Sequence, residues 1–168
     1  WDSQFGSWEY QAVMNQEKGT EIIVDWEDQT SVRMSAAQLY ELVFDGNNKW
    51  MLSANGTLFT YEYEAIIPGL LKRWYEERQE MQRKMRECGD NEIEREYWDK
   101  RQLVKKINLN SLYGAILNPG CRFFDMRIGQ SVTLTGRCIT KHMASKVNEI
   151  VAGKYDHKGE SVVYGDTD

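Results

Sequence analysis

The sequence predicts an α+β protein organised around two long antiparallel helices. Helical spacing of apolar residues extends through two stretches that are joined by only four residues, Cys88 to Asn91. A connection this short forces the two helices to lie antiparallel. Before them, short β-branched and aromatic runs flank polar turns, which is typical of paired antiparallel strands. We therefore expect a strand-rich segment over residues 1–66, a helical hairpin over residues 67–114, and a third part over residues 115–168.

Composition limits the possible classes of protein without selecting one. A chain of 168 residues with 41% hydrophobic residues can bury a sizeable core, and no apolar run has the length of a membrane span. Three cysteines without paired spacing indicate reduced thiols. The net charge of -5 does not by itself indicate nucleic-acid binding. Roughly half of the 21 Lys and Arg residues lie between Lys72 and Lys106, interleaved with acids, and a salt-bridged helical pair explains this mixture as well as a DNA groove does.

The first part of the chain is expected to contain strands and one short helix. Residues 1–34 are aromatic and rich in turns, and we interpret them as strand-forming. Ser35 can cap the short helix, and an Asn55-Gly56 turn separates the last two strands. The expected strands cover residues 22–24, 31–33, 50–53 and 57–61.

The helical hairpin has clear start and stop signals. Pro68 is suited to the first position of a helix that continues to about Glu87. Gly89 ends it, and Asp90 or Asn91 caps a second helix from residue 92 to about residue 112. Arg78 falls inside the apolar stripe of the first helix. A cation there must either extend outward to solvent or face an anionic group.

A further long helix and a final strand are expected after the hairpin. Asn118-Pro119-Gly120 ends the helical run of the hairpin. A strong amphipathic pattern then predicts a buried helix from about residue 128 to residue 151, and residues 161–164 are expected to form a short strand. The apolar positions of the expected helix are Val132, Gly136, Ile139, Met143, Val147 and Ile150.

Two short strings carry the chemical signal. The first, KINLNSLYG over residues 106–114, closes the hairpin. At 3.6 residues per turn, three of its polar residues and one preceding amide fall within about 80° of one another on one helix face. These residues are Gln102, Lys106, Asn110 and Tyr113. The second string is YGDTD over residues 164–168. Its two carboxylates, at i and i+2 of an extended segment, can point to one side, and two such charges imply a bound divalent cation, for which Mg²⁺ is the best match.

The pattern KxxxNSLYG followed by YGDTD resembles the conserved polymerase motifs of family B DNA polymerases, and most closely the replicative enzymes of tailed bacteriophages. The resemblance implies that the hairpin is the fingers and that the flanking parts belong to the palm. It implies DNA-directed nucleotidyl transfer to a primer 3′-hydroxyl with two Mg²⁺ ions. Primer–template DNA and deoxynucleoside triphosphates are the implied partners, together with a sliding clamp reached through other regions. No membrane is expected, and the implied location is the cytoplasm of an infected bacterial host.

The resemblance also implies roles for individual residues. Asp166 and Asp168 would bind the metal ions and carry the catalysis, with Lys106 as a third catalytic group. Arg78 and Lys106 would neutralise the triphosphate as the fingers close. Family members often carry a Lys one turn after this Arg, where the present sequence has Gln82. The nascent base pair would be bordered by Asn110, Tyr113 and Gly114.

One family motif is missing from the sequence, and two other readings compete with the polymerase hypothesis. The third catalytic carboxylate comes from a D-x-x-S-L-Y-P motif, which does not occur here, so we expect the 168-residue chain to be inactive alone. The first competing reading is a helical-hairpin module that binds nucleic acid or protein, in which both strings are accidental. A second possibility is that the chain is the N-terminal flank of an intein inserted after Asp168, although a partial gene segment is the favoured explanation.

Overall fold

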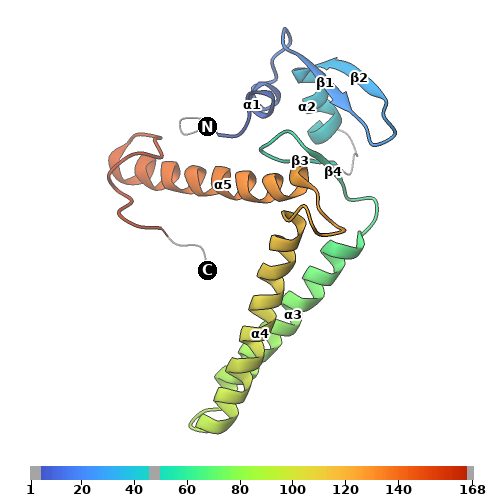
Figure 1. The fold of residues 1–168 in the computed structure, drawn as a ribbon. Helices are drawn as coiled ribbons and strands as arrows, with labels where there is room; N and C mark the ends of the chain where they lie inside the picture. Colours follow the sequence, from blue (N-terminus) through green and yellow to red (C-terminus); the bar gives the residue numbers. More distant parts are fainter. Residues whose placement is uncertain (1–4, 46–49, 166–168) are drawn as a thin grey trace. The chain divides into compact units, whose positions relative to one another are not determined.

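The computed structural model describes residues 5–45 and 50–165, and it confirms the predicted α+β class (Figure 1). Its elements divide into two compact units. One unit contains the chain up to residue 61 and again from residue 130, and the other contains residues 62–129. The elements are α1 (Trp8–Met14), β1 (Glu21–Asp25), β2 (Ser31–Ser35), α2 (Ala36–Tyr40), a π-helical turn (Glu41–Asp45), β3 (Trp50–Leu52), β4 (Leu58–Thr60), α3 (Ile66–Glu87), α4 (Glu92–Ile116) and α5 (Met126–Ala152).

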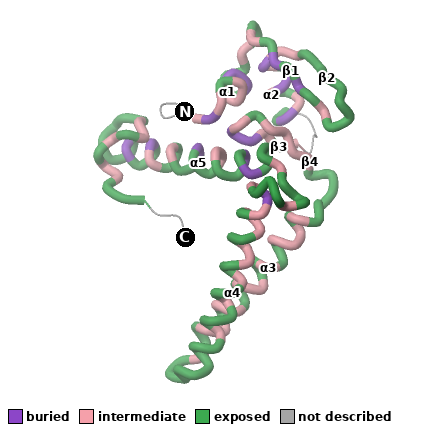
Figure 2. The backbone as a smooth tube through the Cα atoms, viewed as in Figure 1, coloured by how far each residue is buried: buried purple, intermediate pink, exposed green. Residues whose placement is uncertain are grey.

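The core of the first unit lies against the β1–β2 sheet. The two strands are antiparallel, with Val24 opposite Val32. Burial alternates along β1, so Ile22 and Val24 face the core while Ile23 is exposed, as expected for a sheet with one covered face. Helices α1 and α2 and the π-helical turn supply the remaining buried residues of this cluster, and Figure 2 colours buried residues purple along the backbone. The buried cluster consists of Ala12, Val13, Ile22, Val24, Ala36, Leu39 and Val43.

Helix α1 replaces a region that the sequence led us to expect as strand. Ser7 caps this helix, since its Oγ accepts a hydrogen bond from the Tyr10 amide at 3.2 Å. Ala12 and Val13 then point into the core. The aromatic residues of this stretch favour strands, but a cap and two small buried residues are enough to stabilise a short helix in its tertiary context. The predicted cap of α2 is confirmed, because Ser35 forms a capping box with Gln38.

The β3–β4 hairpin is confirmed, and its turn is attached to two helices of the same unit. Gly56 has a φ of +87°, which glycine adopts without strain. The Ala54 carbonyl accepts a hydrogen bond of 2.7 Å from the Ser7 amide, which is the cap residue of α1. The Ala54 amide donates to Oγ1 of Thr135 on α5 at 3.0 Å. The turn therefore links the N-terminal elements to α5.

Helices α3 and α4 form the predicted antiparallel hairpin and lie side by side (Figure 1). Helix α3 begins at Ile66, so Pro68 lies in the first turn rather than at the first position. It costs no hydrogen bond there, and Gly69 donates the first helical bond, to Ala65. Gly89 has a φ of +54°, and Asn91 caps α4 by accepting a hydrogen bond from the Glu94 amide. Helix α4 continues past the expected end to Ile116.

Helix α5 has nearly the predicted bounds, but the expectation that its apolar face is buried is wrong. The apolar positions are exposed, and the buried residues of the helix lie on another face and are small or polar. The small and polar face of α5 is buried because it contacts the rest of its unit; Thr135, for example, accepts a hydrogen bond from the Ala54 amide. Helical periodicity predicts that a stripe exists, not that this segment contains its partner. The exposed side chains are Val132, Ile139, Met143, Val147 and Ile150, and the buried ones are Ser131, Cys138, Ser145 and Asn148.

The final strand expected at residues 161–164 is absent. Ser161 belongs to a turn, and residues 162–165 follow in irregular conformation. A strand requires a hydrogen-bonded neighbour, and none of the strands in the described ranges pairs with this stretch. Across those same ranges, no helix is both long and apolar enough to cross a lipid bilayer.

Candidate functional site

The predicted polar face of α4 lies on one uninterrupted helix. Gln102, Lys106, Asn110 and Tyr113 are all within α4, so their helical spacing places them on a common face. Lys106 and Asn110 are exposed, whereas Gln102 and Tyr113 are half-buried. The face therefore offers a cation and an amide to solvent, between two groups that contact neighbouring parts of the protein.

Arg78 is joined to this face by a contact across the hairpin. It lies half-buried on α3, and its Nε donates a hydrogen bond of 3.2 Å to Oε1 of Gln102. The other end of that amide donates to Asp99 at 2.9 Å, which fixes its orientation. Gln102 precedes Lys106 by one helical turn. The Arg78 guanidinium is thus directed to the same side of α4 as Lys106, without a carboxylate of the described residues as its ion-pair partner.

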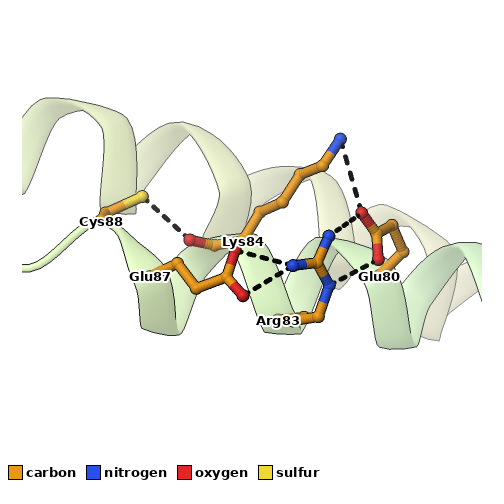
Figure 3. A network of polar contacts seen from close by, with 5 residues as sticks. All are labelled: Glu80, Arg83, Lys84, Glu87 and Cys88. Atoms are coloured by element: carbon orange, nitrogen blue, oxygen red, sulfur yellow. Dashed lines mark hydrogen bonds and ion pairs between the residues drawn. The ribbon is translucent and has the colours of Figure 1, made fainter.

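Most other cations of the hairpin are neutralised by nearby carboxylates. Arg83 binds Glu80 and Glu87, each at 2.6 Å, and Lys84 lies 3.8 Å from Glu80 (Figure 3). The hydrogen bond from Arg83 lowers the pKa of the Glu80 carboxyl. Lys100 pairs with Glu96 on α4 at 2.7 Å. These contacts are the salt-bridged pattern that the composition suggested.

Lys105 and Lys106 are neighbours in sequence but differ in their environment. Lys105 reaches across the hairpin to Oε2 of Glu77 at 2.5 Å and lies 5.7 Å from the centre of the Trp74 ring. Its hydrogen bond is the main cause that lowers the pKa of the Glu77 carboxyl. Lys106 lies about 100° further around the helix and has no ion pair among the described residues. Of the two, only Lys106 has its charge available to a ligand.

The end of the polar face is held in place from the next segment. The Tyr113 hydroxyl donates to the Gly129 carbonyl at 3.4 Å. Gly114 is exposed, and a Cβ built on it would meet no atom within 4 Å. Packing among the described residues therefore does not require glycine at this position. Tyr113 is positioned by the protein, while the space next to Gly114 is open.

The two predicted metal ligands, Asp166 and Asp168, lie outside the described residues, and their roles stay predictions. Within residues 5–45 and 50–165, no cluster of three or more His, Cys, Asp or Glu side chains could hold a metal ion. His142 packs against Phe5 with ring centres 5.0 Å apart and is hydrogen-bonded to Tyr155. His157 meets the same Phe5 ring edge-on.

Two contacts near the candidate residues were not foreseen in the sequence. The Arg78–Gln102 bond depends on the register of the hairpin, for which one sequence contains no signal. Asn148, which is 1% exposed, binds two backbone groups of the segment that precedes YGDTD. The only feature of the sequence that relates to these contacts is the glycine at position 159, which leaves room for the Asn148 side chain.

Comparison with known proteins identifies the family. A family model described as DNA polymerase family B matches residues 15–168, which include the hairpin and both sequence strings. The chain belongs to this family.

Individual relatives come from several kinds of organism. A DNA polymerase of Pyrococcus glycovorans is 36% identical over 110 residues, which cover 66% of this chain and 13% of the relative. A DNA polymerase of Paramecium bursaria Chlorella virus NY2A is 34% identical over 112 residues, with 65% and 12% covered. A DNA-directed DNA polymerase of Escherichia phage RB69 is 38% identical over 68 residues, with 40% and 8% covered. The chain thus spans only a small part of the length of the curated relatives it matches.

Proposed function

We propose that the chain is part of a DNA-directed DNA polymerase and supplies the nucleotide-binding face of its fingers, together with part of its palm. The observation that carries this proposal is the pair Arg78 and Lys106. Both cations lie without a carboxylate partner among the described residues and on the side of α4 that contains the polar face, whereas Arg83, Lys100 and Lys105 of the same hairpin are each paired with a carboxylate. Family membership and the polar face of α4 support the same assignment.

The proposed reaction adds a deoxynucleotide to a primer. The primer 3′-oxygen forms a bond to the α-phosphorus of a deoxynucleoside triphosphate, and the bond from that phosphorus to the pyrophosphate oxygen breaks. Arg78 and Lys106 would bind the triphosphate and offset the negative charge on the leaving pyrophosphate. Asn110, Tyr113 and Gly114 would border the new base pair, with Tyr113 already oriented by its bond to Gly129.

The metal site would be completed by groups outside the described residues. When bound, two Mg²⁺ ions would activate the primer hydroxyl and stabilise the leaving group, held by Asp166 and Asp168 with a carboxylate supplied by another part of the polymerase. The chain's own contribution would be the two carboxylates of the YGDTD string. Because the third carboxylate is missing from the sequence, we expect no primer extension by these 168 residues alone.

Partners and source follow from the same proposal. Primer–template DNA and deoxynucleoside triphosphates would be the substrates, and a sliding clamp would bind through other regions of the polymerase. The match to the phage RB69 enzyme supports the proposal of a tailed-bacteriophage source, and the cytoplasm of an infected bacterium would then be the proposed location. The interaction-module hypothesis loses its premise, because the family match includes both strings that it treats as accidental.

The polymerase proposal is tested by Lys106→Ala and Arg78→Ala in the longer polymerase that contains this segment. Each change removes a proposed triphosphate contact, so single-nucleotide incorporation is expected to fall by about 10²-fold or more. The matched control is Lys100→Ala, an exposed lysine on the same helix that is paired with Glu96. Rapid-quench kinetics with circular dichroism as a check on folding would measure the effect. Incorporation by Lys106→Ala equal to that of Lys100→Ala would rule out the assigned role.

A further inference from the structure

The C-terminal half of α5 contains a buried side-chain amide. Asn148 is 1% exposed, although asparagine is a poor residue for a helix interior and a buried amide costs free energy unless it is hydrogen-bonded. Its position on the buried face of α5 places the amide against the segment that follows the end of the helix and runs back along it.

Asn148 binds the returning segment at two points. Its Nδ2 donates to the Asp156 carbonyl at 2.6 Å, and its Oδ1 accepts from the Ser161 amide at 3.0 Å. One side chain therefore attaches both ends of the segment 156–161 to α5 through hydrogen bonds. Asp156 also accepts from the Lys158 amide at 2.9 Å, which stabilises the turn within this segment.

The backbone between the two points approaches Asn148 closely. A Cβ added to Gly159 would lie 2.6 Å from Cγ of Asn148, a distance that non-bonded carbon atoms do not tolerate. Any larger residue at this position would therefore force either the Asn148 side chain or the segment to move, which would disturb the hydrogen bonds between them. The two residues form one device, which we name the Asn148 clamp and define as Asn148, Gly159 and the backbone of Asp156 and Ser161.

The Asn148 clamp lies just upstream of the YGDTD string. Ser161 precedes Tyr164 by three residues, and residues 162–165 belong to no strand of the described ranges. We infer that Asn148 is a positioning residue for polymerisation, which sets the start of the segment that delivers Asp166 and Asp168. This inference rests on the proposed polymerase function. It assigns to Asn148 a role in the rate of the chemical step rather than in nucleotide binding.

Ser145 provides a matched control on the same helix face. It lies one turn before Asn148 and is fully buried, but its hydroxyl has no hydrogen-bond partner in the described part of the chain. Ser145→Ala therefore alters a buried polar group of α5 without removing a contact to residues 156–161. The comparison separates the effect of the clamp from the effect of changing the interior of the helix.

The test compares Asn148→Ala with Ser145→Ala in the longer polymerase that contains this segment. Single-turnover incorporation gives the maximal rate and the nucleotide dissociation constant, and the burst amplitude gives the fraction of active enzyme. A positioning role predicts that Asn148→Ala lowers the maximal rate per active site by about tenfold or more, with the dissociation constant changed by less than about twofold. Ser145→Ala should leave both values close to those of the unmodified enzyme.

Gly159→Ala tests the clamp without altering Asn148, in case Asn148→Ala does not fold. It should lower the same maximal rate, whereas Gly136→Ala, at a helix position where a Cβ meets nothing within 4 Å, should not. Loss of burst amplitude or melting temperature with an unchanged rate per active site in Asn148→Ala and Gly159→Ala would overturn the inference. Failure of the unmodified polymerase to extend primers would instead refute the proposed function itself, and the inference with it.

Discussion

Adjacent lysines on α4 have separate tasks because a helix turns by about 100° per residue. Lys105, with a side chain that is 22% exposed, holds the two arms of the hairpin together through Glu77. Lys106, about 100° further around the helix, is exposed and has no ion pair among the described residues, so it keeps its charge for a ligand. Substitution of Lys105 should therefore affect stability, whereas substitution of Lys106 should affect ligand binding. The sequence alone does not show which of the two adjacent lysines has which role.

The Lys105–Glu77 contact predicts a pH-dependent contribution to stability. Because the pKa of Glu77 is lowered from 4.5 in the folded protein, the contribution is present above that value and is lost as the pH falls through the lower, folded value. Lys105→Ala should therefore lower the melting temperature at neutral pH, and the difference from the unmodified chain should shrink as the pH falls below 4.5 and through the lower, folded pKa of Glu77. Thermal unfolding followed by circular dichroism across this range measures it. A difference that is constant with pH would show that Lys105 acts only through its contact with Trp74.

At the scale of residues, the sequence predicted which polar groups share a helix face, but not which of them form hydrogen bonds or ion pairs with other segments of the chain. The spacing of Gln102, Lys106 and Asn110 was sufficient, since it needs only an unbroken helix. The link from Arg78 to Gln102 and the role of Asn148 depend on contacts between segments that are distant in sequence. Periodicity contains no information about such contacts.

At the scale of elements, the junction between α4 and α5 depends on a close approach of Leu117 to Gly129. A Cβ on Gly129 would lie 2.0 Å from Cδ2 of Leu117. The Gly129 carbonyl also accepts the bond from Tyr113, so the same point of backbone supports the end of the polar face. A glycine here serves packing, in contrast to Gly114, beside which the described structure leaves open space.

Gly129→Ala is expected to destabilise the unit that contains the hairpin, because either Leu117 or the backbone must move. The expected loss is about 1–3 kcal/mol, as for other overpacking substitutions. Leu117→Ala combined with Gly129→Ala should recover part of this loss, since the shorter side chain leaves room for the added methyl group. Urea unfolding of the single and double variants measures the coupling. Additive losses in the double variant would show that the two side chains do not compete for the same space.

Start and stop signals predicted the elements better than composition did. The caps Ser35 and Asn91 and the turn at Gly89 are where the sequence indicated. Helix α1 was missed because its aromatic residues favour strands, while its stability comes from the Ser7 cap and from burial of small residues. The strand expected near residue 161 requires a partner strand, which local sequence cannot provide.

At the scale of the whole molecule, the apolar stripe of α5 is a hydrophobic surface that is left exposed in the described part of the chain. The stripe consists of Val132, Ile139, Met143, Val147 and Ile150, and it is exposed along the length of the helix. A continuous apolar face of this kind is typical of a surface that another part of a protein covers. The curated relatives extend far beyond the matched region, which is consistent with such a cover.

We expect the isolated chain to self-associate through this stripe. Met143→Glu should reduce association and the binding of a hydrophobic dye, because it places a charge in the middle of the stripe, where the side chain is 65% exposed. Thr140→Glu adds the same charge at an exposed position that is already polar and serves as the control. Sedimentation velocity would detect the change. A monomeric unmodified chain that binds no dye would contradict the expectation.

The register of the hairpin also determines where its length can change during evolution. Insertions around residues 88–91 lie beyond the Arg78–Gln102 bond and extend the tip of the hairpin. They leave the alignment of α3 with α4 at that bond unchanged. A single residue inserted between Gln102 and Lys106 would instead rotate the lysine by about 100° away from the arginine's side of the helix. Variation in length should therefore accumulate at the tip, while the four-residue interval from Gln102 to Lys106 tolerates no insertion or deletion.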